Sequence, residues 1–385
     1  MKILILGIDG YIGWALALHQ LSLGNEVCGI DNFSRRKNVE EMKSWSAIPI
    51  LSMNERIKYL KEKYGDKITF FEGDLLDSQF INDIMKKSQP DSIVHLAEQP
   101  SAPYSMIDQN HTIYTHQNNV MGTLNLLFAI KNYAPKAHLV KLGTMGEYGY
   151  EAGLEITEGF FEIEFRGKKG MIPYPRQAGS WYHWTKVHDS NNIMFACKLW
   201  GLRSTDIMQG IVYGTRTNEI IDKKDHTRFD FDESFGTVIN RFCSQAVIGH
   251  PLSIYGAGGQ TRGFLALVDS IQCISILLDK PAEENEYRVV NQFDEQYNVA
   301  ELAKKIQTVG NKKNLNVQIQ KFENPRLEKE NHYYKADHNI LKELGFKPTR
   351  LIDDEIDMML DDLITYKDRI NEKKDSIIKF LSWQR

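Results

Sequence analysis

Short apolar segments alternate with helical patterns up to about residue 145 of the chain. The run from Lys2 to Leu6 is short, apolar and followed by a glycine turn, which predicts a buried parallel strand. A helical pattern covers 12–23, and a second strand at 26–30 ends at Asp31. Further strands are predicted at 68–71, 92–96, 138–142 and 203–207, with helical patterns at 34–66 and 107–131. This alternation predicts an α/β fold with a doubly wound parallel sheet.

The pattern becomes less regular beyond Gly210. Helical patterns at 235–248 and 270–278 alternate with short strands such as 252–255, which predicts a smaller C-terminal α/β substrate domain interleaved with the first. We expect the first domain to cover 1–210, with 265–295 returning to it. The second domain would combine 211–264 with 296–385. It would close over the carboxyl ends of the parallel strands, where ligands of such sheets bind.

The turn after the first strand carries glycine at every third position, as Gly7, Gly10 and Gly13. Such glycines let the backbone approach a pyrophosphate at the N-terminus of the next helix. Asp31 follows about 20 residues later, where a carboxylate binds the adenosine ribose hydroxyls and repels a 2′-phosphate. The arrangement predicts a Rossmann domain that binds NAD rather than NADP, a preference that Arg35 and Arg36 just beyond Asp31 weaken.

The residues expected to contact this cofactor lie in the glycine turn, at strand ends and on the loops and helices next to them. They are Gly7, Asp9, Gly10, Tyr11, Ile12, Gly13, Asp31, Asn32, Ser34, Arg35, Asp74, Leu75, Leu96, Asn118, Tyr182 and Lys186.

Tyr182 and Lys186 stand four positions apart, so on a helix their side chains share one face. A free phenol has a pKa of about 10, and a neighbouring ammonium lowers it. The pair is suited to take a proton from a sugar hydroxyl while a hydride leaves the same carbon. The same spacing also occurs by chance on surface helices. Thr144, after the strand at 138–142, completes a Thr/Tyr/Lys set whose hydroxyl would bind the substrate.

Composition excludes several other classes of protein. The 385 residues carry a formal net charge of -4, which gives no electrostatic reason to bind nucleic acid or an acidic membrane. The four cysteines include no C-x-x-C pair, so they indicate neither a disulfide framework nor a zinc site. His95, His111, His116 and His138 have no metal-ligand spacing, and we expect no metal. No stretch is long and apolar enough to cross a bilayer.

With the glycine turn and the Thr/Tyr/Lys set in place, the chain resembles extended short-chain dehydrogenase/reductases that act on nucleotide sugars. The stretches 98–108, 143–149, 186–190 and 258–263, with 324–326 and 332–334, narrow the resemblance to the UDP-sulfoquinovose synthase family, from near residue 2 to near residue 382. That resemblance implies tightly held NAD and conversion of UDP-glucose and sulfite to UDP-sulfoquinovose and water, an activity classed with the hydrolases. The steps would be oxidation at C4, loss of the C5 proton and C6 hydroxyl, addition of sulfite at C6 and return of the hydride to C4.

The groups that perform the elimination are less clear. Related sugar 4,6-dehydratases carry Asp and Glu as acid and base where Met145 and Gly146 stand here. Glu147 and His183 are the nearest titratable candidates, and His183 has a structural hydrogen-bonding role as an equal alternative. Met145 would lie beside C6 as a shape element, or simply pack in the core. Plant-type members carry Arg where this chain has Pro100. If that Arg helps to bind sulfite or substrate, this chain would need another cation there or a different sulfur donor.

Substrate binding is expected to need arginine, which forms bidentate bonds with a diphosphate. Arg262 is the strongest candidate, followed by Arg326 and then Arg241, each with a solvated surface position as the alternative. Gln99, Ser101 and Gln209 are expected to join Thr144 and Tyr182 at the sugar.

Two other functions remain open: a UDP-sugar 4-epimerase or 4,6-dehydratase, and a protein that senses NAD without turnover. Sensors of that kind typically lose the tyrosine or the lysine. We expect a homodimer or higher homo-oligomer, paired through the helix that carries Tyr182 and the helix before it. Because no leader precedes Met1, a cytoplasmic enzyme is expected. Sulfite would arrive free or from a donor protein.

Overall fold

A computed structural model describes residues 1–149, 154–324 and 335–378. Its main sheet has seven strands in the order β12-β8-β5-β4-β1-β2-β3, and all neighbouring strands are parallel. The strands are β1 (Lys2–Leu6), β2 (Glu26–Asp31), β3 (Ile68–Glu72), β4 (Ser92–His95), β5 (His138–Leu142), β8 (Arg203–Gln209) and β12 (Tyr287–Gln292). The strand order reverses direction between β1 and β4, so the doubly wound parallel sheet predicted from the sequence is confirmed.

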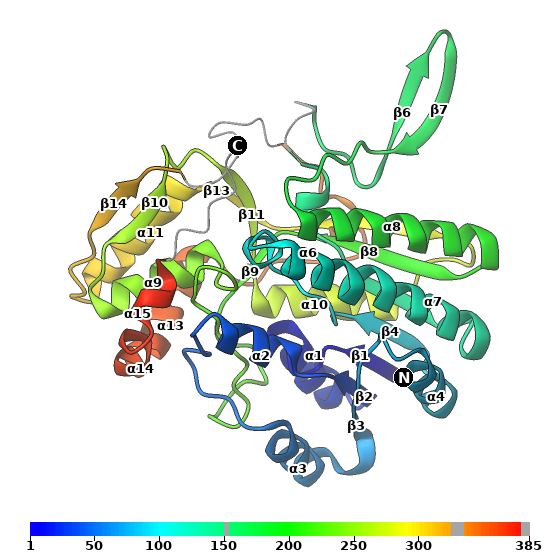
Figure 1. Cartoon of the computed structure of the whole chain (residues 1–385), viewed down its shortest axis with the longest axis horizontal. Helices are drawn as coiled ribbons and strands as arrows, with labels where there is room; N and C mark the ends of the chain where they lie inside the picture. Colours follow the sequence, from blue (N-terminus) through cyan, green and yellow to red (C-terminus); the bar gives the residue numbers. More distant parts are fainter. Residues whose placement is uncertain (150–153, 325–334, 379–385) are drawn as a thin grey trace.

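Helices cover both faces of this sheet (Figure 1). One core lies between the sheet, α1 (Tyr11–Ser22) and α10 (Leu267–Asp279). The other core lies between the sheet and α4 (Ser78–Ser88), α7 (Gly122–Tyr133) and α8 (Trp181–Trp200). β1 reads as an apolar run after Lys2 because both of its faces are buried, and β5 is buried along its whole length, including His138 and Lys141.

The helical pattern at 107–131 is not one regular helix. It forms α6 (Gln109–His116), a π-helical turn η2 (Gln117–Met121) and then α7. The pattern at 34–66 divides into α2 (Ser34–Glu41) and α3 (Met53–Tyr64), followed by the short turn η1 (Gly65–Lys67). Ser52 caps α3, and its capping box with Glu55 explains why that helix begins there.

A second unit packs beside the carboxyl ends of the main strands. It contains the parallel pair β10 (Leu252–Tyr255) and β14 (Ile319–Phe322), and the three-stranded sheet β13 (Glu295–Asn298), β11 (Thr261–Ala266) and β9 (Ile211–Tyr213). Its helices include α9 (Val238–Ile248), α11 (Val299–Lys312) and α13 (Ile352–Ile364), which share one apolar core. Between these segments the chain returns to the main sheet through α10 and β12.

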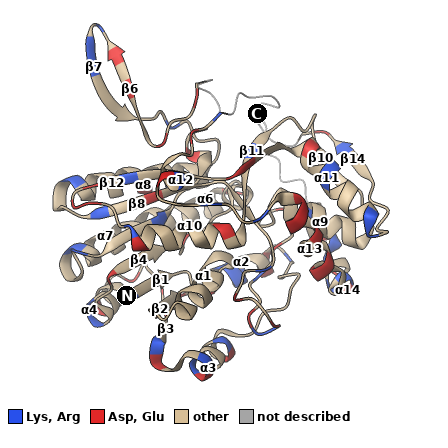
Figure 2. Ribbon diagram, turned by 180° about the vertical axis from the view of Figure 1, so that it is seen from behind, with Lys and Arg blue, Asp and Glu red and all other residues tan. Residues whose placement is uncertain are grey.

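The remaining elements are short. They are α5 (Ala102–Ser105), η3 (Met145–Glu147), α12 (Ile340–Glu343), α14 (Lys367–Asn371), α15 (Lys374–Ile377) and the hairpin of β6 (Phe160–Phe165) and β7 (Lys168–Pro173). The hairpin projects from the body of the molecule above α8 (Figure 1). Basic and acidic residues are interspersed over the face shown in Figure 2. No helix within the described residues has the length and apolar character needed to span a bilayer.

Candidate active site

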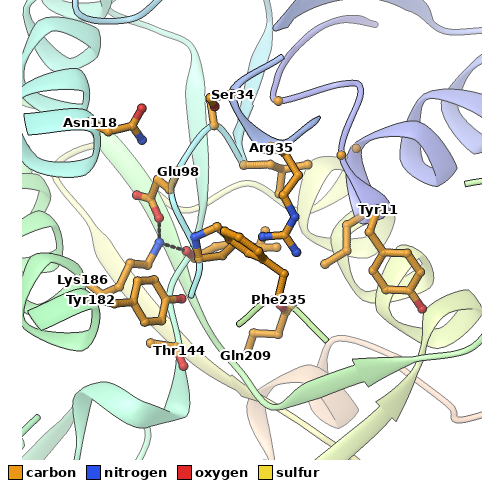
Figure 3. Close-up of a pocket in the computed structure, with 18 of the residues that line it drawn as sticks. Tyr11, Ser34, Arg35, Glu98, Asn118, Thr144, Tyr182, Lys186, Gln209 and Phe235 are labelled. Carbon is orange, nitrogen blue, oxygen red and sulfur yellow. Dashed lines mark hydrogen bonds and ion pairs between the residues drawn. The ribbon is translucent and has the colours of Figure 1, made fainter. Parts of the chain in front are cut away.

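A cavity of about 390 Å³ opens at the carboxyl ends of β1, β2, β4, β5 and β8. The glycine turn lines one end, and Thr144, Tyr182, His183 and Lys186 line the other. Residues that lie far apart in the sequence therefore face one space (Figure 3). Its position at the strand ends is the one that parallel α/β sheets use for ligands.

The glycine turn brings two backbone segments unusually close together. A Cβ at position 13 would lie 2.2 Å from the carbonyl oxygen of Gly7. Gly7 has φ +86° and its N–H donates to Ile30 at 2.8 Å, so it joins the ends of β1 and β2. A side chain at either position would displace backbone rather than a flexible neighbour. The close approach places the first turn of α1 at the cavity, where its N–H groups would fit a cofactor diphosphate.

Asp31 lies at the end of β2 and lines the cavity. Its carboxylate accepts hydrogen bonds from the backbone N–H groups of Asp9 and Phe33, both at 2.8 Å. Burial, together with the Asp9 carboxylate, raises the pKa of Asp31 to about 6. The group is therefore largely ionised at neutral pH and suited to accept from ribose hydroxyls.

The two arginines beyond Asp31 are both engaged with carboxylates. Arg36 pairs with Asp9 at 2.6 Å, and Arg56 reaches the same carboxylate at 2.9 Å. Arg35 pairs with Asp230 at 2.8 Å, and its guanidinium lies 4.2 Å from the centre of the Phe235 ring. Arg35 and Arg36 were the residues that weakened the predicted preference for NAD over NADP. In the structure their charges are paired with Asp230 and Asp9. At the same end of the cavity Asp74 accepts a 2.8 Å hydrogen bond from Asn32.

Tyr182 and Lys186 lie near the start of α8, whose first turn Ser180 caps. Both side chains are buried, and Lys186 donates to the carbonyl of Leu142 at the end of β5. Lys186 also forms an ion pair with Glu98, from the loop after β4 (Figure 3). Figure 3 places the Thr144 and Tyr182 side chains on the same side of this cavity.

The acid–base properties of the pair differ from the simple expectation. Burial raises the pKa of Tyr182 above its ordinary value, and the cations Lys141 and Arg35 offset this only in part. Burial also lowers the pKa of Lys186 to about 8, although Asp189 and Asp206 raise it. The expected lowering of the phenol pKa is therefore outweighed in this structure by removal of the site from water.

Glu147 does not face the cavity. Its carboxylate is fully buried and pairs with Arg176 at 2.8 Å and Lys141 at 3.3 Å, and it accepts from Ser190 at 2.9 Å. Met145 is also buried, in a small apolar cluster with Tyr148 and others. The turn η3 points both side chains inward because Thr144 and Glu147 form a reciprocal capping box.

His183, in contrast, lines the cavity. Its Nδ1 lies 2.9 Å from the Ser180 hydroxyl, which fixes the ring on the first turn of α8. A Cβ at position 146 would lie 2.3 Å from His183 Nε2, so Gly146 provides the space that the imidazole occupies. Of the two titratable candidates for the elimination, the structure brings only His183 to the cavity.

The loop after β4 presents alternate residues to the cavity. Glu98, Pro100 and Ala102 line it, whereas Gln99 and Ser101 are turned into the protein. Gln99 donates to Thr115 and to the Ser101 carbonyl, and the Ser101 hydroxyl donates to the carbonyl of Ser234. These two residues thus shape the loop from its buried side. Gln209 does line the cavity, and Asn118 lies on its wall within the π-helical turn.

A second cavity of about 220 Å³ adjoins the first, and Ile211 and Thr237 line both. Arg241 and Arg262 face it from α9 and β11, as does Asn324. Arg241 is buried, with its guanidinium 5.6 Å from the Tyr255 ring centre. Arg326 lies outside the described residues.

Glu98 is a charged residue of the cavity wall that the sequence does not single out, although it belongs to a stretch that carries the family resemblance. The available signal was a carboxylate just beyond the end of a buried parallel strand. Among the described residues, no cluster of three or more His, Cys, Asp or Glu is arranged to hold a metal ion.

Comparisons with known proteins agree with this geometry. Residues 3–300 match the model of the NAD dependent epimerase/dehydratase family. UDP-sulfoquinovose synthase of Sulfolobus acidocaldarius is 48% identical over 386 residues, covering 100% of this chain and 98% of the relative. The chloroplastic UDP-sulfoquinovose synthase of Spinacia oleracea is 47% identical, covering 100% of this chain and 79% of the relative.

Solved structures confirm the fold. UDP-glucose 4-epimerase of Thermotoga maritima, solved with UDP-glucose, has a TM-score of 0.71 at 20% identity and covers 94% of this chain and 98% of its own. The much higher identity to the synthases favours that reading over the epimerase alternative. NAD is the cofactor of the family, and the glycine turn and Asp31 fit it. The chain belongs to the NAD-dependent epimerase/dehydratase family, and within it to the UDP-sulfoquinovose synthases.

Proposed function

We propose that the chain converts UDP-glucose and sulfite to UDP-sulfoquinovose and water in the cavity lined by Tyr182 and Lys186. The strongest support is full-length identity of 48% to a UDP-sulfoquinovose synthase, together with the gathering of Thr144, Tyr182, Lys186 and the glycine turn around one cavity. When bound, NAD supplies the redox chemistry, accepting a hydride from C4 of the sugar and later returning it.

Tyr182 is the proposed acid–base group for the C4 hydroxyl. The phenolate form of Tyr182 takes the hydroxyl proton as the hydride leaves, and the resulting phenol returns it in the last step. Thr144 would bind the same hydroxyl, and Lys186 would hold the nicotinamide ribose. Because the site is buried, charges on these groups act with little screening by solvent.

The elimination and addition need a second proton carrier. Oxidation at C4 makes the C5 proton acidic, and loss of that proton with the C6 hydroxyl produces an enone and water. The sulfur lone pair of sulfite then bonds to C6, and C5 regains a proton. We assign the proton transfers to His183, which lines the cavity, whereas Glu147 is held away from it by Arg176 and Lys141.

The second cavity is proposed to bind UDP. Arg262 and Arg241 would neutralise the diphosphate, and Ile211 and Thr237 mark the passage by which the glucose reaches the first cavity. Gln209, on the wall of the first cavity, would contact the sugar. Arg326 is retained as a further candidate from the sequence.

The larger organisation is also a proposal. We assign 1–210 and 265–295 to the cofactor domain, and 211–264 and 296–385 to the substrate domain. Pairing of two copies through α7 and α8 is supported by exposed apolar side chains on these helices, namely Phe128, Phe195 and Leu199. We further propose a cytoplasmic enzyme that takes sulfite directly or from a donor.

Mass spectrometry of UDP-glucose incubated with the purified protein tests the reaction. We expect a product in which sulfonate replaces one hydroxyl, formed only when sulfite is present. Tyr182→Phe serves as the control and should lower turnover by about 100- to 10,000-fold while leaving bound NAD unchanged. Accumulation of UDP-galactose or of a dehydrated 4-keto sugar with sulfite present would contradict the proposal.

A further inference from the structure

The Tyr182/Lys186 pair has an acidic neighbour whose position the fold controls closely. Glu98 lies on the loop after β4, and Asn119 in η2 holds that loop from both sides. The Asn119 side chain accepts from the Gln99 N–H at 2.8 Å and donates to the Gln99 carbonyl at 3.1 Å. The same amide donates to the Thr185 hydroxyl at 2.9 Å. One asparagine therefore connects the residue after Glu98 to the residue before Lys186.

Glu98 and Lys186 form a buried ion pair across this junction. Their side chains are 5% and 2% exposed, so water contributes little to stabilising either charge. Lys186 also donates to the Leu142 carbonyl, which brings the ends of β4, β5 and α8 together at its ammonium. A buried lysine without a carboxylate partner tends to lose its proton. Glu98 is the carboxylate whose oxygen contacts the Lys186 ammonium directly.

The second oxygen of Glu98 is buried without a hydrogen-bond donor among the described residues. It lies 3.6 Å from His95 Nε2, but burial lowers the pKa of His95 to about 3, so that imidazole is neutral and does not compete for the carboxylate. The negative charge of Glu98 is thus directed mainly at Lys186.

Resting on the proposed function, we propose that Glu98 is a positioning residue of the reaction. Its carboxylate keeps the Lys186 ammonium charged and in place beside Tyr182, and thereby sets the pH range over which the pair works. Glu98 touches neither the sugar nor the reacting carbon in this role. It acts through Lys186, whose ammonium would contact both the Glu98 carboxylate and the cofactor ribose.

Other charged and titratable groups also surround the pair, and they stay constant when Glu98 is changed. They are Asp189 and His183 on α8, Asp206 on β8, Lys141 on β5, Glu147 in η3, His95 on β4 and Arg35 on α2. Because Glu98 attracts the ammonium, removing the Glu98 charge lowers the pKa of Lys186 and favours its neutral form. Removing this negative charge also lowers the pKa of Tyr182 and favours its phenolate. Both effects move the pH range of turnover toward lower pH.

The test compares the wild-type chain with Glu98→Gln and Glu98→Asp. The dissociation constant for NAD is measured by isothermal titration calorimetry from about pH 6 to about pH 9, and turnover is measured over the same range. An opposite charge in contact shifts a pKa by about 1–3 units, so in the plot of turnover against pH we expect the alkaline limb of Glu98→Gln to lie about one pH unit or more below that of the wild type. Glu98→Asp keeps the charge with shorter reach, and its limb should lie between the two.

Thr185→Val is the matched control, because it disturbs the same junction through Asn119 without altering charge. Its NAD affinity and stability are expected to fall with no movement of the limb. The proposal would be overturned if the alkaline limbs of turnover against pH coincided for wild type and Glu98→Gln and the two proteins differed only in maximal turnover. If Glu98→Gln does not fold, Glu98→Asp decides: a limb coincident with the wild type overturns the proposal. The NAD affinity is measured without sulfite. A failure to make the sulfosugar would therefore contradict the proposed reaction without affecting the test of Glu98.

Discussion

Replacing Glu147 by glutamine distinguishes a structural role for this residue from a catalytic one. The carboxylate is fully buried and receives donors from Arg176, Lys141, Ser190 and, at 3.4 Å, the Thr144 backbone. A glutamine amide keeps one accepting oxygen. Its NH2 group, however, would face one of these donors and could not accept from it. Breaking a buried ion pair from one side costs about 3–5 kcal/mol.

We therefore expect Glu147→Gln to lower the free energy of unfolding by about 3–5 kcal/mol, measured by urea titration of the full chain. With a urea m-value of about 3 kcal/mol/M, the midpoint falls by about 1 to 1.7 M. Turnover per folded molecule, measured well below the melting temperature, should stay within about tenfold of the wild type, since the residue transfers no proton.

His183→Asn is the matched comparison. It should cost about 1 kcal/mol of stability or less, and lower turnover by about 100-fold or more if His183 carries the elimination protons. A structural role for Glu147 is excluded if Glu147→Gln unfolds at the wild-type midpoint and yet loses more than about 100-fold in turnover. That result would return Glu147 to the list of proton carriers.

Three further changes test the cofactor and UDP cavities. Gly13→Ala places a Cβ 2.2 Å from the Gly7 carbonyl, and should give protein that purifies without NAD, as measured by chromatography of the denatured supernatant; full NAD content would contradict the close approach. Arg262→Met should weaken UDP binding about 10- to 100-fold in calorimetry, because a charge-assisted hydrogen bond contributes about 1.5–3 kcal/mol, and unchanged affinity would remove Arg262 from the diphosphate site. Since the pKa of Asp31 is raised to about 6, its carboxylate gains a proton below that pH and NAD affinity should fall by about tenfold from about pH 7 to about pH 5; a flat profile would show that the ribose does not rely on Asp31.

Local pattern alone was enough to predict the cofactor half of this chain. Strand, glycine turn, helix, strand and Asp31 follow one another within a single βαβ unit, so the geometry of that unit alone brings the glycine turn and Asp31 together. The same holds for Tyr182 and Lys186, which one helix carries four positions apart. The motifs also sufficed to recognise the family, which the full-length relatives confirm.

Tertiary structure decided which side chains of a motif face the ligand. The sequence offers both Glu147 and His183 as candidates, but a capping box turns Glu147 inward to Arg176, while Gly146 makes room for His183 at the cavity. Gln99 was expected at the sugar and Glu98 was not noticed, because the direction of a loop side chain depends on contacts made by distant residues. Here the deciding contact is the amide of Asn119, which no local pattern specifies.

The pKa of Tyr182 likewise depends on how much water the fold excludes and on charges from β5, η3, α2 and its own helix α8. Spacing along the chain determined which groups meet on one helix or one turn. Burial and ion pairing with residues from elsewhere in the chain determined the charge state and orientation of these side chains. Desolvation and such ion pairs exist only after the fold has formed.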